Sequence, residues 1–196
     1  DKILNINECH IQTPIANEVL KIIWKKVLEL ELEPYDIKVH TGFIRNVIIR
    51  SSANTNDVMV NLVTSQKDIQ AIQPIADTLI SNFPQITSIV NNITKRKAGV
   101  SIGEHQIVLH GNDYITEKVG GYEFMISANS FFQTNTQQAI KLYNIILEET
   151  SLTGSEIVYD LFCGPGSIAL YISAHAKMVY GFELSMSAVQ DAMQNA

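Results

Sequence analysis

The chain has 196 residues, of which 46% are hydrophobic and 17% charged, and its formal net charge is −6 at pH 7. This composition excludes an intrinsically disordered chain, which needs low hydrophobicity and high charge, and it excludes collagen-like or low-complexity sequence. No apolar run reaches the roughly 18 residues that a membrane-spanning helix needs, so no membrane partner is expected. The length suits one large or two small domains.

The cysteines and the charge distribution narrow the setting further. Two cysteines, Cys9 and Cys163, cannot form a disulfide framework, which favours a reducing, cytoplasmic environment. Residues 1–125 hold 12 basic and 14 acidic residues, whereas residues 126–196 hold 2 and 6. The acidic balance does not favour bulk electrostatic binding of nucleic acid. Basic groups that can meet phosphate therefore lie almost wholly in the first part.

The first part of the chain predicts an α+β domain. Apolar residues recur at helical spacing from Pro14 to about Leu32, and again from Lys67 to Asn82. The other apolar segments predict six short strands, at residues 47–49, 58–63, 86–93, 106–110, 114–119 and 122–126. Residues 1–125 are therefore expected to form an α+β central domain with a mainly antiparallel sheet.

After residue 125 the pattern becomes an alternation of helices and strands. A helix is predicted from Thr134 to Glu149, with Thr134 or Thr136 as its cap. Strands at residues 156–162 and 177–183 then alternate with helices at residues 167–175 and 185–196. This order is the beginning of a doubly wound parallel sheet. Two parallel strands with open edges do not make a stable domain, so residues 126–196 are expected to be the truncated start of a Rossmann-like α/β domain.

The turn after the first of these strands predicts a binding site. It reads Asp-Leu-Phe-Cys-Gly-Pro-Gly-Ser over residues 160–167, and glycines at a strand–helix turn let a ligand approach the backbone. The carboxylate of Asp160 would repel a pyrophosphate but suits a cationic ligand, and Glu183 is placed to hold both hydroxyls of a ribose. A cation at one end and a ribose diol at the other describe S-adenosylmethionine. A dinucleotide site, as in a nicotinamide-dependent oxidoreductase, and a turn without a ligand remain alternatives.

Three motifs and their spacing carry a family resemblance. Ser-Phe-Phe-Gln-Thr-Asn at residues 130–135 is followed by the turn at residues 160–166 and then by Gly-Phe-Glu at residues 181–183. Together they resemble the RNA (uracil-5-)-methyltransferases that modify bacterial 23S ribosomal RNA and tRNA, and residues 42–50 are similar to the central domain of the ribosomal RNA branch. The resemblance implies an S-adenosyl-L-methionine-dependent enzyme. The predicted cofactor-binding residues are Gln133, Asp160, Phe162, Gly164, Gly166, Ser167 and Glu183.

The resemblance also implies a covalent mechanism. A cysteine thiolate adds to C6 of uracil, C5 takes the methyl group, and a glutamate removes the C5 proton. Both groups belong to the family's C-terminal part, so no catalytic residue is assigned in this chain, which reads as an internal fragment that is inactive by itself. Cys163 lies in the cofactor loop and is expected to be structural.

Cys9 is the one candidate metal ligand. In several members of the family four cysteines bind an iron–sulfur cluster, and Cys9 matches the position of the fourth. The resemblance leaves open whether the intact protein carries a 4Fe-4S cluster, because one cysteine cannot hold one. The alternative is a small core residue.

RNA is the expected partner, and the resemblance favours ribosomal RNA over tRNA. Lys95, Arg96 and Lys97, with Arg45 and Arg50, are candidates for phosphate contacts, although a short charge run is usually a solvated face. One ring of the Phe-Phe pair at residues 131–132 is a candidate for facing a flipped base, with core packing as the alternative. A catalytically inactive RNA-binding module is a further alternative, and the sequence does not indicate the oligomeric state.

Overall fold

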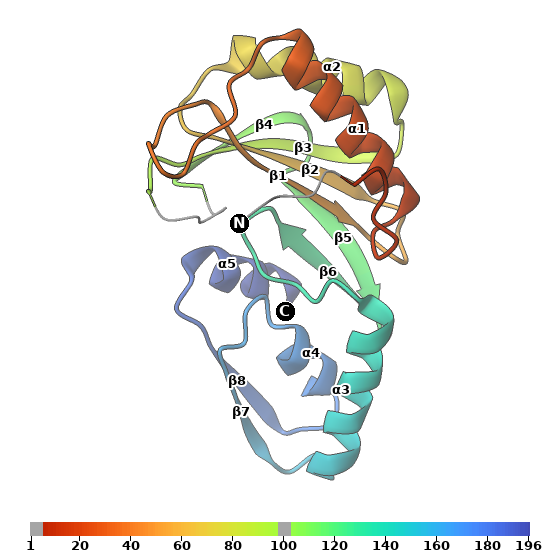
Figure 1. The fold of residues 1–196 in the computed structure, drawn as a ribbon. Helices are drawn as coiled ribbons and strands as arrows, with labels where there is room; N and C mark the ends of the chain where they lie inside the picture. Colours follow the sequence, from red (N-terminus) through yellow and green to blue (C-terminus); the bar gives the residue numbers. More distant parts are fainter. Residues whose placement is uncertain (1–5, 98–102) are drawn as a thin grey trace. The chain divides into compact units, whose positions relative to one another are not determined.

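The computed structural model describes residues 6–97 and 103–196, and the chain divides into two compact units. The first unit spans residues 1–51 and 58–112, and the second spans residues 52–57 and 113–196 (Figure 1). The sequence predicted a boundary between residues 125 and 126, and that domain division stays a prediction. The compact units divide at residue 113 and group a short loop of the first part with the second unit. Within the described ranges, no helix combines the length and hydropathy that crossing a bilayer requires.

The first unit is a four-stranded sheet with two helices over one face (Figure 1). Its elements are α1 (Pro14–Glu29), β1 (Ile44–Ser51), β2 (Val58–Thr64), α2 (Ile69–Asn82), β3 (Ile86–Ile93) and β4 (His105–Gly111). The strand order is β1-β2-β3-β4, and only the β2–β3 pairing is parallel. The predicted α+β unit with a mainly antiparallel sheet is therefore confirmed, and α2 makes the crossover that a parallel pair requires.

Apolar burial holds this first unit together. All seven residues of β2 are buried, and so are seven of the eight in β3. The core cluster takes one stripe from each helix and the facing side of the sheet: Val19, Ile23, Val27, Val58, Val60, Leu62, Ile75, Ala76, Leu79, Phe83, Ile86 and Ile89. Helix α1 begins as predicted, with Pro14 in its first turn and the Thr13 hydroxyl accepting a bond from the Ala16 N–H.

The second unit contains two separate two-stranded sheets and three helices. Its elements are β5 (Tyr114–Val119), β6 (Tyr122–Ser127), α3 (Thr136–Thr150), β7 (Ile157–Leu161), α4 (Ser167–Ser173), β8 (Met178–Phe182) and α5 (Met186–Asn195). β5 and β6 pair antiparallel, and β7 and β8 pair parallel, which confirms the predicted strand–helix–strand–helix order.

The cap of α3 differs from the prediction. Asn135 is the capping residue, and its side-chain oxygen accepts a bond from the Gln138 N–H at 3.1 Å. The prediction of Thr134 or Thr136 was therefore wrong. Thr136 is the first residue inside the helix, and its hydroxyl donates instead to Glu117, 2.8 Å away.

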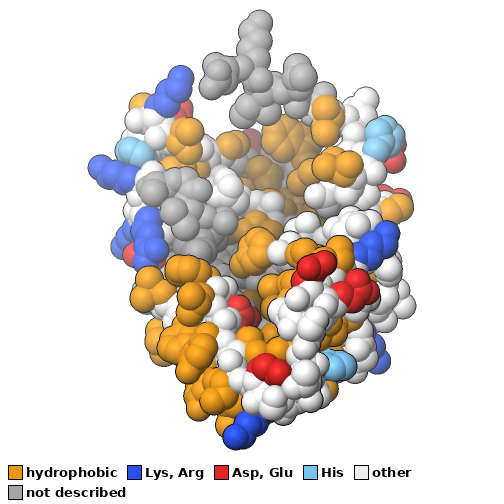
Figure 2. Space-filling model, turned by 90° about the horizontal axis from the view of Figure 1, so that it is seen from below, with side chains coloured by type: hydrophobic (Ala, Val, Ile, Leu, Met, Phe, Trp, Pro, Cys, Tyr) orange, Lys and Arg blue, Asp and Glu red, His pale blue; other side chains and the backbone are white. Residues whose placement is uncertain are grey.

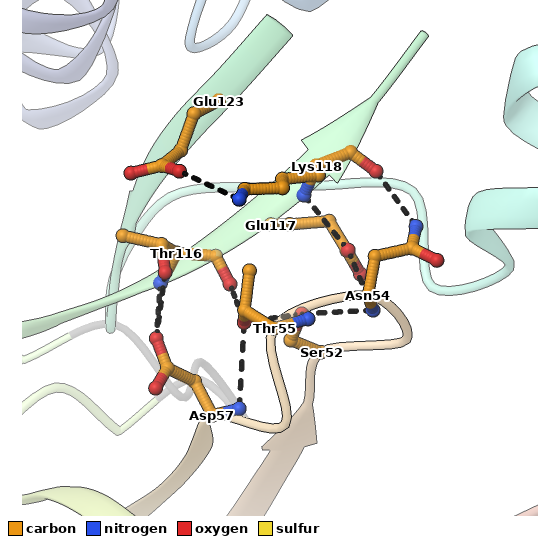
Figure 3. A network of polar contacts seen from close by, with 8 residues as sticks. All are labelled: Ser52, Asn54, Thr55, Asp57, Thr116, Glu117, Lys118 and Glu123. Carbon is orange, nitrogen blue, oxygen red and sulfur yellow. Dashed lines mark hydrogen bonds and ion pairs between the residues drawn. The ribbon is translucent and has the colours of Figure 1, made fainter. Parts of the chain in front are cut away.

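Side chains of the loop at residues 52–57 close the free edge of β5 (Figure 3). The Thr116 N–H donates to Asp57 Oδ2 at 2.9 Å, and the Thr116 carbonyl accepts from the Thr55 hydroxyl at 2.7 Å. The Asn54 side-chain amide donates to the Lys118 carbonyl at 2.7 Å. A two-stranded ribbon leaves backbone groups unpaired on both edges, and here polar side chains pair with those of β5.

Glu117 fastens the same loop from inside the unit. The residue is 3% exposed, and its carboxylate accepts bonds from the backbone N–H groups of Ala53, Asn54 and Lys118 at 2.7, 3.1 and 2.9 Å. The Thr136 hydroxyl makes a fourth bond. A buried carboxylate is stable only when it is paired or hydrogen-bonded. This network explains why residues 52–57 group with the second unit.

One face of the β7–β8 pair is apolar and open. Alternate residues on both strands share this face and are exposed: Ile157, Tyr159, Leu161, Met178, Tyr180 and Phe182. The rings of Tyr159 and Tyr180 stack across the pair with centroids 5.6 Å apart. Figure 2 shows contiguous groups of hydrophobic side chains at the surface of the molecule. Parallel strands are usually covered on both faces, so this exposure distinguishes the pair from β2 and β3.

Candidate functional site

The loop after β7 and the end of β8 meet through Glu183. One oxygen of its carboxylate accepts a bond from the Gly164 N–H at 3.0 Å. The other oxygen accepts from the N–H groups of Leu184 and Ser185, both at 2.7 Å. The bond from Ser185 contributes most to a lowered pKa of Glu183, with Gly164 and Leu184 acting in the same direction against partial burial. The carboxylate is therefore ionised at neutral pH and lies directly beside the glycine loop.

Asp160 brings a second carboxylate to this end of the sheet. It lies in β7, is half-buried, and accepts a bond from the Ala169 N–H of α4 at 3.1 Å. Burial raises the pKa of Asp160, and the bond from Ala169 opposes that shift. Two carboxylates on neighbouring parallel strands give the site a negative potential, which suits a ligand that carries a positive charge.

The loop itself adopts backbone conformations that few residues tolerate. Gly164 and Gly166 have φ values of 57° and 80°, and a Cβ on Gly164 would meet no atom within 4 Å. Phe162 has a φ of 64° although it carries a large side chain, and that side chain is 87% exposed. The Phe182 carbonyl accepts bonds from the N–H groups of Phe162 and Cys163 and so fixes the start of the loop. A strained, exposed aromatic residue beside open backbone is typical of a binding site.

Cys163 packs inside this turn and has no feature of a nucleophile. Its sulfur lies against Gly181, where a Cβ would come within 2.8 Å of the Sγ atom. Burial raises the pKa of the Cys163 thiol, and the carboxylates of Asp160 and Glu183 raise it further. The thiol is therefore protonated at neutral pH, which supports the structural role expected from the sequence.

Two further residues that were predicted to contact the methyl donor lie in the same unit, but no bond joins them to Glu183 or Asp160 in the contacts described. Ser167 begins α4 and accepts a bond from the Tyr143 hydroxyl at 3.1 Å, which ties it to α3. Gln133 is exposed on the segment between β6 and α3. Because Asn135 caps α3, Gln133 is not needed for that task. The roles of both residues toward a methyl donor stay predictions.

The two neighbouring phenylalanines, Phe131 and Phe132, differ in burial. Phe132 is buried and packs against Phe124 with ring centroids 5.8 Å apart, so it belongs to the core of the second unit. Phe131 is 69% exposed. Of the pair, Phe131 is therefore the ring that remains a candidate for contacting a base.

A cavity of about 470 Å³ borders the site without coinciding with it. Its lining includes Gly166 and Glu183 but neither Asp160 nor Phe162, and most of it comes from apolar residues of α4, β8 and α5. The predicted site therefore consists of the glycine loop and Glu183, at the carboxyl ends of β7 and β8. The cavity lies next to it, among residues of α4, β8 and α5.

The first unit gives no metal site around Cys9 in the described residues. The Cys9 thiol forms no disulfide, and the backbone N–H and carbonyl of Cys9 bond with the Asn17 side chain at 2.8 and 3.1 Å. Across residues 6–97 and 103–196, no group of three His, Cys, Asp or Glu side chains is placed to hold a metal ion. The residues described here do not by themselves fit an iron–sulfur cluster, and a ligand role for Cys9 stays a prediction.

The basic residues of the first unit are partly engaged within the protein. The Arg45 guanidinium donates to the carbonyls of Thr94 and Arg96 at 3.4 and 2.8 Å and lies 4.0 Å from the centroid of the Tyr35 ring. Arg96 also pairs with Glu104 at 3.8 Å. Arg45 therefore has a structural role within the first unit, and phosphate contacts by Arg45 and the other basic residues stay predictions.

Sequence reasoning missed three side chains that hold the second unit together. Glu117, Asp191 and Asn195 all bond to backbone groups of other segments. The strand pattern held a visible signal for Glu117, because it occupies the inward-facing position between Ile115 and Val119 in an alternating strand. A charged residue at such a position requires internal partners.

Comparison with known proteins identifies the family of this chain. The tRNA (uracil-5-)-methyltransferase family matches residues 55–196, which cover most of the chain and all of the site described above. The chain belongs to this family. This confirms the resemblance found in the sequence, and it leaves the alternative of a nicotinamide-dependent oxidoreductase without support.

Bacterial relatives carry the same general description. The chain is 42% identical over 197 residues to an uncharacterized RNA methyltransferase of Chlorobaculum tepidum, a match that covers 100% of this chain and 41% of the relative. It is 36% identical to one of Staphylococcus aureus, covering 99% of this chain and 43% of the relative. The chain thus spans less than half the length of these relatives.

A solved structure resembles the whole chain. The Pyrococcus abyssi tRNA (uracil-54, C5)-methyltransferase, crystallised with S-adenosyl-L-homocysteine, matches with a TM-score of 0.80 and 28% identity, over 99% of this chain and 46% of that one. A Methanocaldococcus jannaschii tRNA m1G37 methyltransferase matches with a TM-score of 0.50 and 15% identity, over 90% and 47%. The second match concerns the fold alone. Both agree with a Rossmann-like methyltransferase fold for the second unit.

Proposed function

We propose that this chain supplies the methyl-donor site of an enzyme that transfers a methyl group from S-adenosylmethionine to C5 of a uridine in RNA. The observation that carries the proposal is the hydrogen bond from the Gly164 N–H to Glu183. This bond joins two of the family's motifs at the carboxyl end of the parallel strands β7 and β8. Family membership and the S-adenosyl-L-homocysteine in the Pyrococcus structure support the same reaction.

The charge of the site and an exposed aromatic ring support this choice of donor. A carboxylate has about four lone-pair sites, and three of those on Glu183 accept backbone N–H bonds. The remaining site, on the oxygen bonded to Gly164, is proposed to accept a ribose hydroxyl. Asp160 adds negative charge toward a cationic group, and the exposed ring of Phe162 offers an apolar surface. Bound S-adenosylmethionine supplies an electrophilic methyl group. This chain's residues hold and orient the donor, and no nucleophile or proton acceptor is assigned among them.

The RNA substrate is the finer part of the proposal. The sequence predicted ribosomal RNA, whereas the family description and the Pyrococcus neighbour name tRNA. Neither the family match nor the relatives favour the ribosomal choice. We therefore propose RNA uridine as the substrate class and make the kind of RNA an outcome of the assay. A protein that binds RNA and never transfers a methyl group would correspond to the inactive module considered from the sequence.

The decisive experiment compares two glutamates of the second unit in the full-length protein. Glu183→Ala removes the group that is proposed to hold the ribose, and Glu156→Ala removes a carboxylate just before β7 that also binds backbone N–H groups. Calorimetry should show donor binding weakened by about 1.5–3 kcal/mol for Glu183→Ala, the scale of hydrogen bonds to a charged group, and little changed for Glu156→Ala.

Transfer is then measured with methyl-labelled donor on tRNA and on 23S ribosomal RNA, and 5-methyluridine is identified by mass spectrometry. Labelled 5-methyluridine in either RNA supports the proposal and identifies the substrate. Unchanged donor affinity in a folded Glu183→Ala protein would refute the role of Glu183. No transfer to either RNA, with donor binding intact, would refute the proposed reaction.

A further inference from the structure

Helix α5 closes the edge of β6 with side chains. The Asn195 oxygen accepts a bond from the Met125 N–H at 2.7 Å, and its amide nitrogen donates to the Met125 carbonyl at 3.2 Å. One turn earlier, Asp191 accepts a bond from the Ser127 N–H at 3.1 Å. β6 pairs with β5 along its other edge, so these side chains stand where a neighbouring strand would otherwise bind.

Asn195 differs from Asp191 in making one further contact. Its amide nitrogen also donates to the carbonyl of Pro165 at 3.1 Å. Pro165 is buried and lies between Gly164 and Gly166, at the centre of the glycine loop. An amide nitrogen carries two hydrogens, so Asn195 binds β6 and the loop at the same time.

Each of the two segments that Asn195 joins holds, or continues into, residues that are predicted to bind the methyl donor. The loop carries Gly164 and Gly166, and β6 runs directly into the segment that holds Gln133. The two glycines have left-handed φ values, and glycine loses more conformational freedom on ordering than any other residue. A loop that is fixed before the ligand arrives binds it with a smaller entropic loss.

We infer that Asn195 is a positioning residue for the methyl-donor site. It holds the Pro165 carbonyl against β6 and so keeps the glycine loop at a fixed distance from the segment that leads to Gln133. Asn195 acts through the loop backbone. The inference rests on the proposed function of that loop.

The test uses the full-length protein with Asn195→Ala and Asn195→Asp, and Asp191→Ala as the matched control. All three variants weaken the attachment of α5 to β6, but only the Asn195 variants lose the bond to Pro165. Asn195→Asp keeps an acceptor for the Met125 N–H and loses both donated bonds, so it keeps one of the two strand contacts while it loses the loop contact.

Two readouts follow the loop and the donor separately. Hydrogen exchange without donor is measured on peptides covering residues 163–167, where the Gly166 N–H bonds to the Cys163 carbonyl at 3.0 Å. Exchange there should be roughly tenfold faster in the Asn195 variants and within about twofold of wild type in Asp191→Ala. Calorimetry should show S-adenosylmethionine binding weakened by roughly tenfold in the Asn195 variants and by less than about twofold in the control, as expected for one lost hydrogen bond.

The outcomes separate this inference from the proposed function. Equal effects of Asn195→Ala and Asp191→Ala on loop exchange and donor affinity would mean that Asn195 only docks α5, and would overturn the inference. Unchanged exchange in a folded Asn195→Asp protein would overturn it as well, and this variant decides if Asn195→Ala does not fold. A wild-type protein that binds no methyl donor, while loop exchange still depends on Asn195, would refute the proposed function and leave only the finding that Asn195 orders the glycine loop.

Discussion

The two units of this chain reach stability in different ways. In the first, two helices cover a four-stranded sheet whose central strands β2 and β3 are buried along almost their whole length. In the second, two narrow sheets are joined by directed side-chain bonds, and one apolar face of β7–β8 is open. Both units contain a parallel strand pair, so pairing alone does not decide burial. The same kind of substitution should therefore have very different effects in the two units.

The largest difference is expected for leucines on the two parallel pairs. Leu62 in β2 is fully buried, whereas Leu161 in β7 is 65% exposed. Leu62→Ala leaves a cavity and should lower the free energy of unfolding by about 2–5 kcal/mol. Leu161→Ala should change it by about 0.5 kcal/mol or less, because little of that side chain leaves water on folding.

The two leucine variants need a probe in each unit. The single tryptophan of the sequence, Trp24, lies in α1, so its fluorescence during urea unfolding follows the first unit. Amide hydrogen exchange of β7 follows the second. Equal losses for the two variants would contradict the comparison, because they would mean that the open face of β7–β8 is covered in solution.

A smaller effect is expected where a polar side chain holds the second unit together. Glu117 and Glu123 lie on the paired strands β5 and β6, but Glu117 is buried with four bonds and Glu123 forms an exposed ion pair with Lys118 at 3.6 Å. Glu117→Gln replaces an acceptor oxygen by an NH₂ group that faces donors, and it should lower the free energy of unfolding by about 1–3 kcal/mol. Glu123→Gln should cost about 0.5 kcal/mol or less.

Hydrogen exchange of residues 52–57 supplies the direct check on these glutamates. The Ala53 and Asn54 N–H groups bond to Glu117, so their protection should fall in Glu117→Gln and persist in Glu123→Gln. Protected amides at these two positions in a folded Glu117→Gln protein would show that the loop does not depend on the buried carboxylate.

The regular elements of the fold were accessible from the sequence because they follow local rules. The start of α1 is set by Thr13 and Pro14, and the alternation of strand and helix after residue 155 predicted β7, α4, β8 and α5. The parallel pairing of β2 with β3 was not visible, because pairing depends on which distant strands meet. The cap of α3 was misplaced by one residue, since Thr134, Asn135 and Thr136 can all cap a helix.

The sequence predicted the candidate site as a set of motifs, but it did not predict the geometry among them. The sequence placed Asp160, the glycines and Glu183 at the ends of adjacent strands, and the structure places Glu183 on the Gly164 N–H. The sequence could not show that Asn195, about thirty residues after the loop, bonds to Pro165, because that contact depends on how α5 packs. The loop at residues 52–57 joins the second unit for the same kind of reason.

The smallest predicted effect concerns a carboxylate at the surface of the second unit. Glu156, just before β7, accepts bonds from the Thr153 hydroxyl at 2.6 Å and from the N–H groups of Thr153, Gly154 and Ser155 at 2.9, 3.1 and 3.1 Å. These bonds, that of the Thr153 hydroxyl above all, lower the pKa of Glu156 from 4.5 to about 2. Carboxyl-resolved NMR should therefore find Glu156 still ionised at pH 3.

The sign of the resulting pH dependence follows from the lowered pKa. A carboxylate whose pKa is lower in the folded state stabilises the fold above its unfolded pKa, and the contribution is lost as the pH falls through the folded value. For Glu156 that window runs from 4.5 down to about 2, so amide protection of residues 153–155 should fall across it. Glu156→Gln should remove this pH dependence. A midpoint near 4.5 would mean that the turn before β7 is open in solution, and that bonds to a surface carboxylate add less to the second unit than the buried bonds of Glu117.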